Sequence, residues 1–99
     1  MIGVLGASGA VGGFAVRALR EAGCGPLRLG ARRPGRLSAD DGEVVAVDIT
    51  DPVSLAAFCD GLDVVLNCAG PTYALQETMA LAALAAGAHY VDVGGDDPV

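Results

Sequence analysis

The sequence has no lysine or tryptophan and few aromatic or basic side chains. Its 99 residues include 6 basic residues, all arginines, against 12 Asp and Glu, which gives a formal net charge of −6. This acidic balance argues against nucleic-acid binding, because such binding depends on neutralising phosphates with Lys and Arg. Since aromatic residues make up only 4% of the chain, a core must be built mainly from Val, Leu, Ile and Ala.

Cysteine is also scarce, and long apolar runs are absent. The 3 cysteines form no CxxC pair and no metal-ligand spacing. We therefore expect reduced thiols, a cytoplasmic location and no metal. Residues 1–16 are uncharged but lack the basic start and cleavage pattern of a signal peptide. No stretch approaches the roughly 20 apolar residues of a spanning helix, so we expect no membrane contact.

The sequence does contain enough apolar residues to form the core of one folded domain. Hydrophobic residues make up 53% and charged residues 18%, a balance that excludes a disordered chain. The length corresponds to one domain at most. It is short for a complete two-substrate enzyme, so we expect a piece of one.

Short apolar segments alternate with helical patterns along the chain. Strands are predicted at residues 1–5, 27–31, 44–47, 63–67 and 90–93, and the third and fourth read as parallel strands covered on both faces. Helices are predicted at 11–22, at 51–59 with Asp51 and Pro52 at its start, and at 74–86. The last is apolar nearly all round, so we expect it to be heavily buried. Residues 32–43 are polar and turn-rich.

This alternation predicts an α/β fold. Right-handed crossovers between strands give a three-layer, doubly wound parallel sheet of about five strands, Rossmann-like, in the order 3-2-1-4-5. Such folds bind ligands at the carboxyl edge of the sheet, where the strand order reverses.

A glycine loop follows the first strand directly and opens the first helix. In it Gly6 permits a tight turn, Gly9 lets the backbone approach a pyrophosphate, and Gly12 allows close packing. The phosphates then lie on free amides at the positive end of a helix. The predicted contacts are Gly6, Ser8, Gly9, Ala10, Val11 and Gly12. The alternatives are a purely structural turn for the loop and helix capping for Ser8.

Arginines stand where the second predicted strand ends. An acid at this place holds the ribose of NAD, but Arg32 and Arg33 follow the strand instead. A guanidinium matches a 2′-phosphate in charge and geometry, so these arginines predict NADP(H). The alternative is that they are solvated loop charges.

Two further strand ends complete the predicted site. Asp48 could accept a hydrogen bond from the adenine amino group while Ile49 packs on the ring; alternatively, Asp48 caps the next turn. The fourth strand ends in small residues that permit close approach of the nicotinamide ribose. They are Asn67, Cys68, Ala69, Gly70 and Pro71. Cys68 is interpreted as a packing residue, because no nearby His or Lys would lower its pKa.

These motifs together resemble the NADP-binding domain of the saccharopine dehydrogenase-like oxidoreductases, over essentially the whole chain. The resemblance rests on the glycine loop, Ala31-Arg32-Arg33, Asn67-Cys68-Ala69-Gly70-Pro71 and Gly87-Ala88-His89-Tyr90-Val91-Asp92. It implies an N-terminal domain, residues 1–99, of a longer enzyme whose second domain binds a small-molecule substrate and dimerises. It assigns no catalytic residue within this chain.

Three functional hypotheses remain open at this point. The first is the cofactor domain of a reductase that transfers hydride to or from an imine, carbonyl or enoyl group. The second is a non-catalytic NADP(H) sensor, and the third is a domain with an empty, structural glycine loop. A short-chain reductase is disfavoured, because that chemistry needs Tyr with Lys four residues later and the chain has no lysine. We also expect a homodimer, since the last strand leaves an edge or an apolar face exposed.

Overall fold

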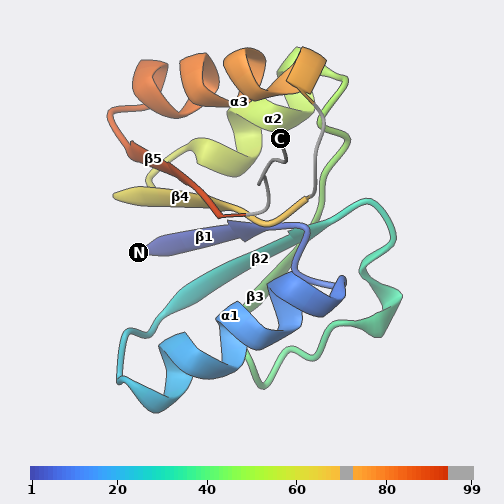
Figure 1. Ribbon diagram of the computed structural model, residues 1–99, viewed down its shortest axis with the longest axis vertical. Coiled ribbons are helices and arrows are strands. Elements are labelled where there is room, and N and C mark those ends of the chain that lie inside the picture. The colour runs from blue at the N-terminus through green and yellow to red at the C-terminus, as the bar shows by residue number, and fades with distance from the viewer. Residues whose placement is uncertain (70–72, 94–99) are drawn as a thin grey trace.

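A parallel β-sheet of five strands runs through the middle of the molecule, with helices on both of its faces (Figure 1). The computed structural model describes residues 1–69 and 73–93. In chain order the elements are β1 (Ile2–Leu5), α1 (Ala10–Glu21), β2 (Leu27–Ala31), the short 3-10 helix η1 (Pro34–Arg36), β3 (Glu43–Ala46), α2 (Pro52–Cys59), β4 (Val64–Asn67), α3 (Tyr73–Ala85) and β5 (His89–Asp92). The strand order β3-β2-β1-β4-β5, with every pair parallel, confirms the predicted topology.

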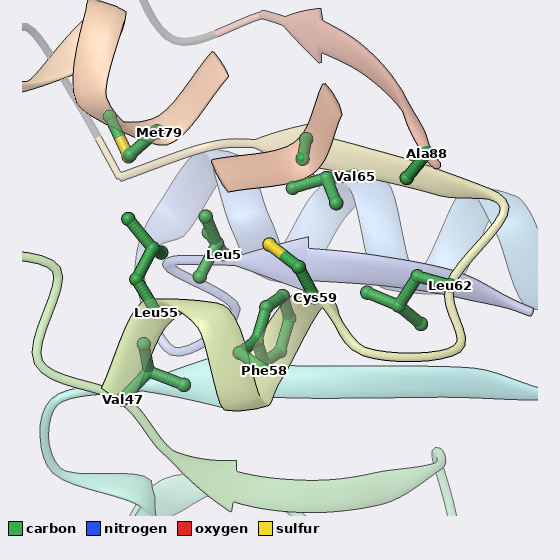
Figure 2. Close-up of a cluster of buried hydrophobic side chains, with 10 residues drawn as sticks. Leu5, Val47, Leu55, Phe58, Cys59, Leu62, Val65, Met79 and Ala88 are labelled. Carbon is green, nitrogen blue, oxygen red and sulfur yellow. The ribbon is translucent and has the colours of Figure 1, made fainter. Parts of the chain in front are cut away.

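The side chains of each strand alternate between two apolar clusters, one on each face of the sheet. Val4 of β1 packs with Val16 of α1 on one face, whereas its neighbour Leu5 packs with α2 and α3 on the other. Figure 2 shows this second cluster, in which Phe58 lies among aliphatic side chains. Such alternation is the direct consequence of the two-residue period of a strand.

Two strand glycines make room for the large ring of Phe58. A Cβ atom added at Gly30 would lie 2.6 Å from the Phe58 ring, and one added at Gly3 would lie 3.0 Å from it and 2.3 Å from Leu62. The ring is fully buried. The molecule therefore fills the centre of this core with one aromatic side chain set against bare backbone.

The ends of α2 are fixed by specific polar groups. The Asp51 side chain accepts a hydrogen bond from the amide of Val53, at 3.1 Å, and Pro52 occupies the first turn, which confirms the predicted start. At the other end, the Arg28 guanidinium donates to the carbonyls of Phe58 (2.6 Å) and Asp60 (2.7 Å). Carbonyls that lack partners at a helix end are thereby satisfied from β2.

The expected heavy burial of the last helix is wrong. In α3, Met79 and Ala83 are fully buried, but Leu81 is 58% and Leu84 64% exposed. The helix packs on α2 and β5 and has no described residues against its outer face. Composition predicted an apolar helix correctly, but it did not show that only one side would be covered.

The third strand is also less covered than its apolar sequence suggested. Val44 and Val45 are half-buried and Ala46 is exposed, because β3 lies at the edge of the sheet.

Across the described residues, no helix is both long and apolar enough to cross a bilayer.

Candidate functional site

The carboxyl ends of four strands enclose a hollow of about 370 Å³ at one edge of the sheet. It is lined by the end of β1 and its loop, the end of β2, the segment after β3 and the turn after β4. The lining residues are Leu5, Gly6, Ser8, Gly9, Gly30, Ala31, Arg32, Val47, Ile49, Cys68 and Ala69. The loops after β1 and β4 meet here, at the point where the strand order reverses, and this is where open α/β sheets bind ligands.

The glycine loop forms the floor of this hollow. Gly6 has a φ of +75° and its amide donates to the carbonyl of Gly30 at 2.9 Å. A Cβ atom added at Gly6 would lie 2.6 Å from the Cα of Ala69. At Gly12 an added Cβ would lie 2.0 Å from the carbonyl oxygen of Gly6. Both positions require glycine, for the tight turn and for close packing respectively.

Gly9 differs from Gly6 and Gly12 because an added Cβ atom there would not clash with any neighbour. The nearest atom to an added Cβ there is the Gly6 carbonyl oxygen, at an ordinary 3.5 Å. Gly9 is also the N-cap of α1, and no side chain caps the helix. The first-turn amides of α1, which include those of Ala10 and Val11, are therefore available to an anion. Ser8 does not act as the helix cap; it is exposed and faces the hollow.

A second hollow, of about 450 Å³, adjoins the first and is lined by arginines. Its walls are Ser8, Arg32, Arg33, Gly35 and Arg36, and it shares Ser8 and Arg32 with the first hollow. None of the ion pairs in the described part of the chain involves these three arginines. Three guanidinium groups are thus gathered beside the glycine loop, within a chain of net charge −6.

The sequence reading missed Arg36, the third of these arginines. It lies in η1, where Pro34 and Gly35 turn the chain immediately after Arg33. Because a turn of this kind brings residues three positions apart close together, Arg36 comes near Arg33. The Pro-Gly pair between two arginine positions was the signal that could have revealed it.

The structure assigns Asp48 to the turn before α2. Its Oδ1 accepts hydrogen bonds from the Thr50 amide, at 2.9 Å, and from the Thr50 hydroxyl, at 2.6 Å. These bonds, together with the nearby Arg32 guanidinium, hold the pKa of Asp48 below its ordinary value. Asp48 does not line either hollow, whereas Ile49 does. An adenine contact from Asp48 therefore remains a prediction, beside a turn role that the structure shows.

Of the three predicted residues at the end of β4 that the structure describes, two line the hollow. Cys68 and Ala69 line it, whereas the side chain of Asn67 is fully buried and hydrogen-bonded to Tyr90 and Asp92 of β5. Burial, and secondly the charge of Asp92, raises the pKa of the Cys68 thiol, which fits a packing residue better than a nucleophile. Gly70 and Pro71 lie outside the described residues. Within the described ranges, no cluster of His, Cys, Asp and Glu could hold a metal ion.

Solved structures with the same fold include nucleotide-bound oxidoreductases. The triphenylmethane reductase of Citrobacter sp. in complex with NADP(H) matches with a TM-score of 0.81 and 28% identity, over 93% of this chain and 36% of that one. A short-chain dehydrogenase/reductase superfamily protein from Agrobacterium tumefaciens, with bound NAD, gives 0.77 and 28%, over 93% and 31%. A nucleoside-diphosphate-sugar epimerase from Pseudomonas aeruginosa gives 0.75 and 31%, over 92% and 32%. This chain thus spans about a third of the length of each.

The relation to the short-chain superfamily qualifies one inference from the sequence. The missing lysine argued against short-chain reductase chemistry, but it does not separate this chain from the nucleotide-binding portion of such proteins.

No curated protein sequence matches the chain significantly. The model of a family described as NAD(P)H-binding matches residues 6–93, which include the glycine loop, the arginines and the carboxyl ends of β2, β3, β4 and β5. The chain therefore belongs to the NAD(P)H-binding family.

Proposed function

We propose that this chain is the NADP(H)-binding domain of an oxidoreductase and that it prefers NADPH to NADH. The observation that carries the proposal is the arginine-lined hollow that opens directly off the hollow of the glycine loop. A dinucleotide whose pyrophosphate lies on the start of α1 would place its adenosine ribose at the end of β2. That is where Arg32, Arg33 and Arg36 gather.

The preference for NADPH follows from the positive charge of the arginines and from the absence of an acidic residue at the end of β2. No Asp or Glu stands between Cys24 and Ala39, so no acid at the end of β2 would hold a free ribose hydroxyl or repel a phosphate. One hydrogen bond to a charged group contributes about 1.5–3 kcal/mol. A single arginine contact would therefore favour NADPH by roughly ten- to a hundredfold.

The parent protein, we infer, is a saccharopine dehydrogenase-like reductase. Support for this family comes from the Asn-Cys-Ala-Gly-Pro and Gly-Ala-His-Tyr-Val-Asp segments, and the NADP(H)-bound triphenylmethane reductase among the similar structures supports a reductase in general. When bound, the cofactor would exchange a hydride at nicotinamide C4 with an imine, carbonyl or enoyl substrate. This chain would hold and orient the cofactor, and a second domain would bind the small-molecule substrate. The three unpaired cysteines support a cytoplasmic location.

A second candidate is a non-catalytic NADP(H) sensor. It would account for every residue assigned here, because the sequence assigns cofactor contacts to this chain but no catalytic residue. A sensor and a cofactor domain would bind NADPH alike. They differ in whether the full-length protein oxidises NADPH when offered imine, carbonyl or enoyl compounds.

Calorimetric titration with NADPH and NADH under identical salt tests the proposal. We expect NADPH to bind at least about tenfold more tightly, and Arg32→Ala to remove most of that difference. Equal binding of both cofactors would retain the cofactor domain and refute the role of the arginines. If neither bound, the cofactor proposal would fail for this chain.

A further inference from the structure

A buried polar network joins the carboxyl ends of β4 and β5. The side chain of Asn67 is 0% exposed and is the only buried polar side chain among the described residues. Its Nδ2 donates to the Tyr90 hydroxyl at 3.0 Å and to Asp92 Oδ2 at 3.3 Å. The Tyr90 hydroxyl in turn donates to Asp92 Oδ2 at 3.4 Å. These three side chains, here named the β4–β5 network, lie on the face of the sheet covered by α2 and α3.

We propose that the β4–β5 network positions the turn after β4, so that this turn can receive the nicotinamide half of the dinucleotide. The proposal rests on the proposed function and extends it to Asn67, Tyr90 and Asp92. None of the three lines the hollow. They act on the cofactor through the turn and are positioning residues.

The connection between network and turn is a single side-chain bond. Asn67 Oδ1 accepts a hydrogen bond from the backbone amide of Ala69 at 3.0 Å. On the strand side, the amide of Cys68 donates to the carbonyl of Leu5 at 2.9 Å. The Asn67 side chain thus bends the backbone at the point where it leaves the sheet and reaches the hollow.

The position of this turn decides the shape of the hollow. Ala69 lies so close to the glycine loop that a Cβ at Gly6 would come within 2.6 Å of its Cα. Cys68 and Ala69 form the wall of the hollow on the β4 side of β1, whereas Arg32 lines it on the β2 side. A turn released from Asn67 would shift against the loop or into the space that the cofactor needs.

Burial gives the network a definite arrangement. A buried polar group without a partner is strongly unfavourable, so Asn67 is restricted to a conformation that satisfies both its amide nitrogen and its oxygen. Burial raises the pKa of the half-buried Tyr90 above its ordinary value, so the hydroxyl keeps its proton and donates to Asp92. A fully paired network of this kind fixes one geometry where an apolar cluster would allow several.

The strand order places this wall at the nicotinamide end. The arginines at the end of β2 would hold the 2′-phosphate of the adenosine half. Because β1 and then β4 follow β2 across the sheet, the other half of the dinucleotide extends toward the turn after β4. Loss of the network should therefore affect that half alone.

The test compares NADPH with adenosine 2′,5′-bisphosphate, which has the adenosine with its 2′- and 5′-phosphates but lacks the second phosphate of the pyrophosphate and the whole nicotinamide riboside. In Tyr90→Phe, which removes only the hydroxyl, we expect NADPH to bind about two- to tenfold more weakly and the bisphosphate to bind as in the wild type. Asn67→Ala should show the same selectivity with a larger loss. Val65→Ala, on the same strand and face and also fully buried, is the control; it should lower thermal stability without changing the ratio of the two affinities.

The possible outcomes distinguish a failure of this positioning proposal from a failure of the proposed NADP(H)-binding function. Selective loss of NADPH affinity in Tyr90→Phe supports the positioning role. Unchanged NADPH affinity, or an equal loss for both ligands, overturns it while the proposed function stands. A wild-type chain that binds neither ligand overturns both.

Discussion

At the scale of single residues, adjacent glycines of α1 differ sharply in the space around them. An added Cβ at Gly12 would lie 2.0 Å from the Gly6 carbonyl oxygen, whereas one at Gly13 would meet nothing within 4 Å. The atoms near Gly12 belong to the backbone of the glycine loop and cannot rotate away. The two positions therefore form a natural pair for testing the loop.

Gly12→Ala should destabilise the fold by about 1–3 kcal/mol, because the new methyl group forces the helix away from the loop. It should also weaken NADPH binding. Gly13→Ala, the matched control, should stabilise the fold by about 0.5–1 kcal/mol, because alanine loses less backbone entropy in a helix. Thermal unfolding and calorimetric titration of both variants provide the check. Equal behaviour of the two variants would contradict this account of the loop.

Arg36 offers a second test at this scale, because only the folded structure assigns it to the arginine-lined hollow. Arg36→Ala should weaken NADPH binding by about three- to tenfold, a reduced effect that reflects solvent exposure. NADH binding should be unchanged. Arg17→Ala removes the same charge from an exposed position on α1 and should affect neither cofactor. Equal losses for NADPH and NADH in Arg36→Ala would show that the guanidinium does not recognise the 2′-phosphate.

At the scale of elements, the sequence predicted best where local signals and tertiary environment agree. β2 begins and ends at the predicted residues, because apolar side chains are bounded by turn residues on both sides. β3 and β5 are each shifted by one residue from the prediction; both are edge strands, whose ends are set by pairing with one neighbour. The exposed face of α3 could not be predicted from the sequence, since composition does not show how many sides of a helix are covered.

The site shows the same division between local and long-range information. The glycine loop and Arg32 follow directly from residue types placed after a strand, and the structure brings them to one edge of the sheet. Arg36 needed the turn of η1 to be known. The inward orientation of Asn67 depends on Tyr90 and Asp92, 23 and 25 residues further along the chain, so its neighbours in sequence carried no sign of it.

At the scale of the whole molecule, the two faces of the sheet are unequally covered. Leu66 of β4 packs in the cluster under α1, and its partner Val91 in β5 lies on the same face. Val91 and Val93 are 43% and 48% exposed there, and Phe14 of α1 is 70% exposed. The described residues leave each of these three apolar side chains partly or largely exposed. We propose that a second copy of the chain covers the exposed apolar side chains of β5 and α1, giving a homodimer.

Light scattering over a range of concentrations tests this proposal. We expect the average mass to rise with concentration, and the rise to diminish in the double variant Phe14→Gln/Val91→Thr. Val53→Thr, a control at a 77% exposed position on α2, should associate like the wild type. A monomer at every concentration would refute the proposal.

The close packing of Phe58 against Gly3 and Gly30 limits how this sequence can change in evolution. The Phe58 ring occupies the space that a Cβ atom at Gly30 would need, and at Gly3 that space is taken mainly by Leu62, with the ring at 3.0 Å, so these four positions cannot vary independently. An alanine at Gly30 becomes acceptable only after a smaller side chain replaces Phe58, and that replacement alone would leave a cavity. Substitutions here must therefore arrive together or in one permitted order. Among descendants of this chain, Gly3, Gly30, Phe58 and Leu62 should change as a set.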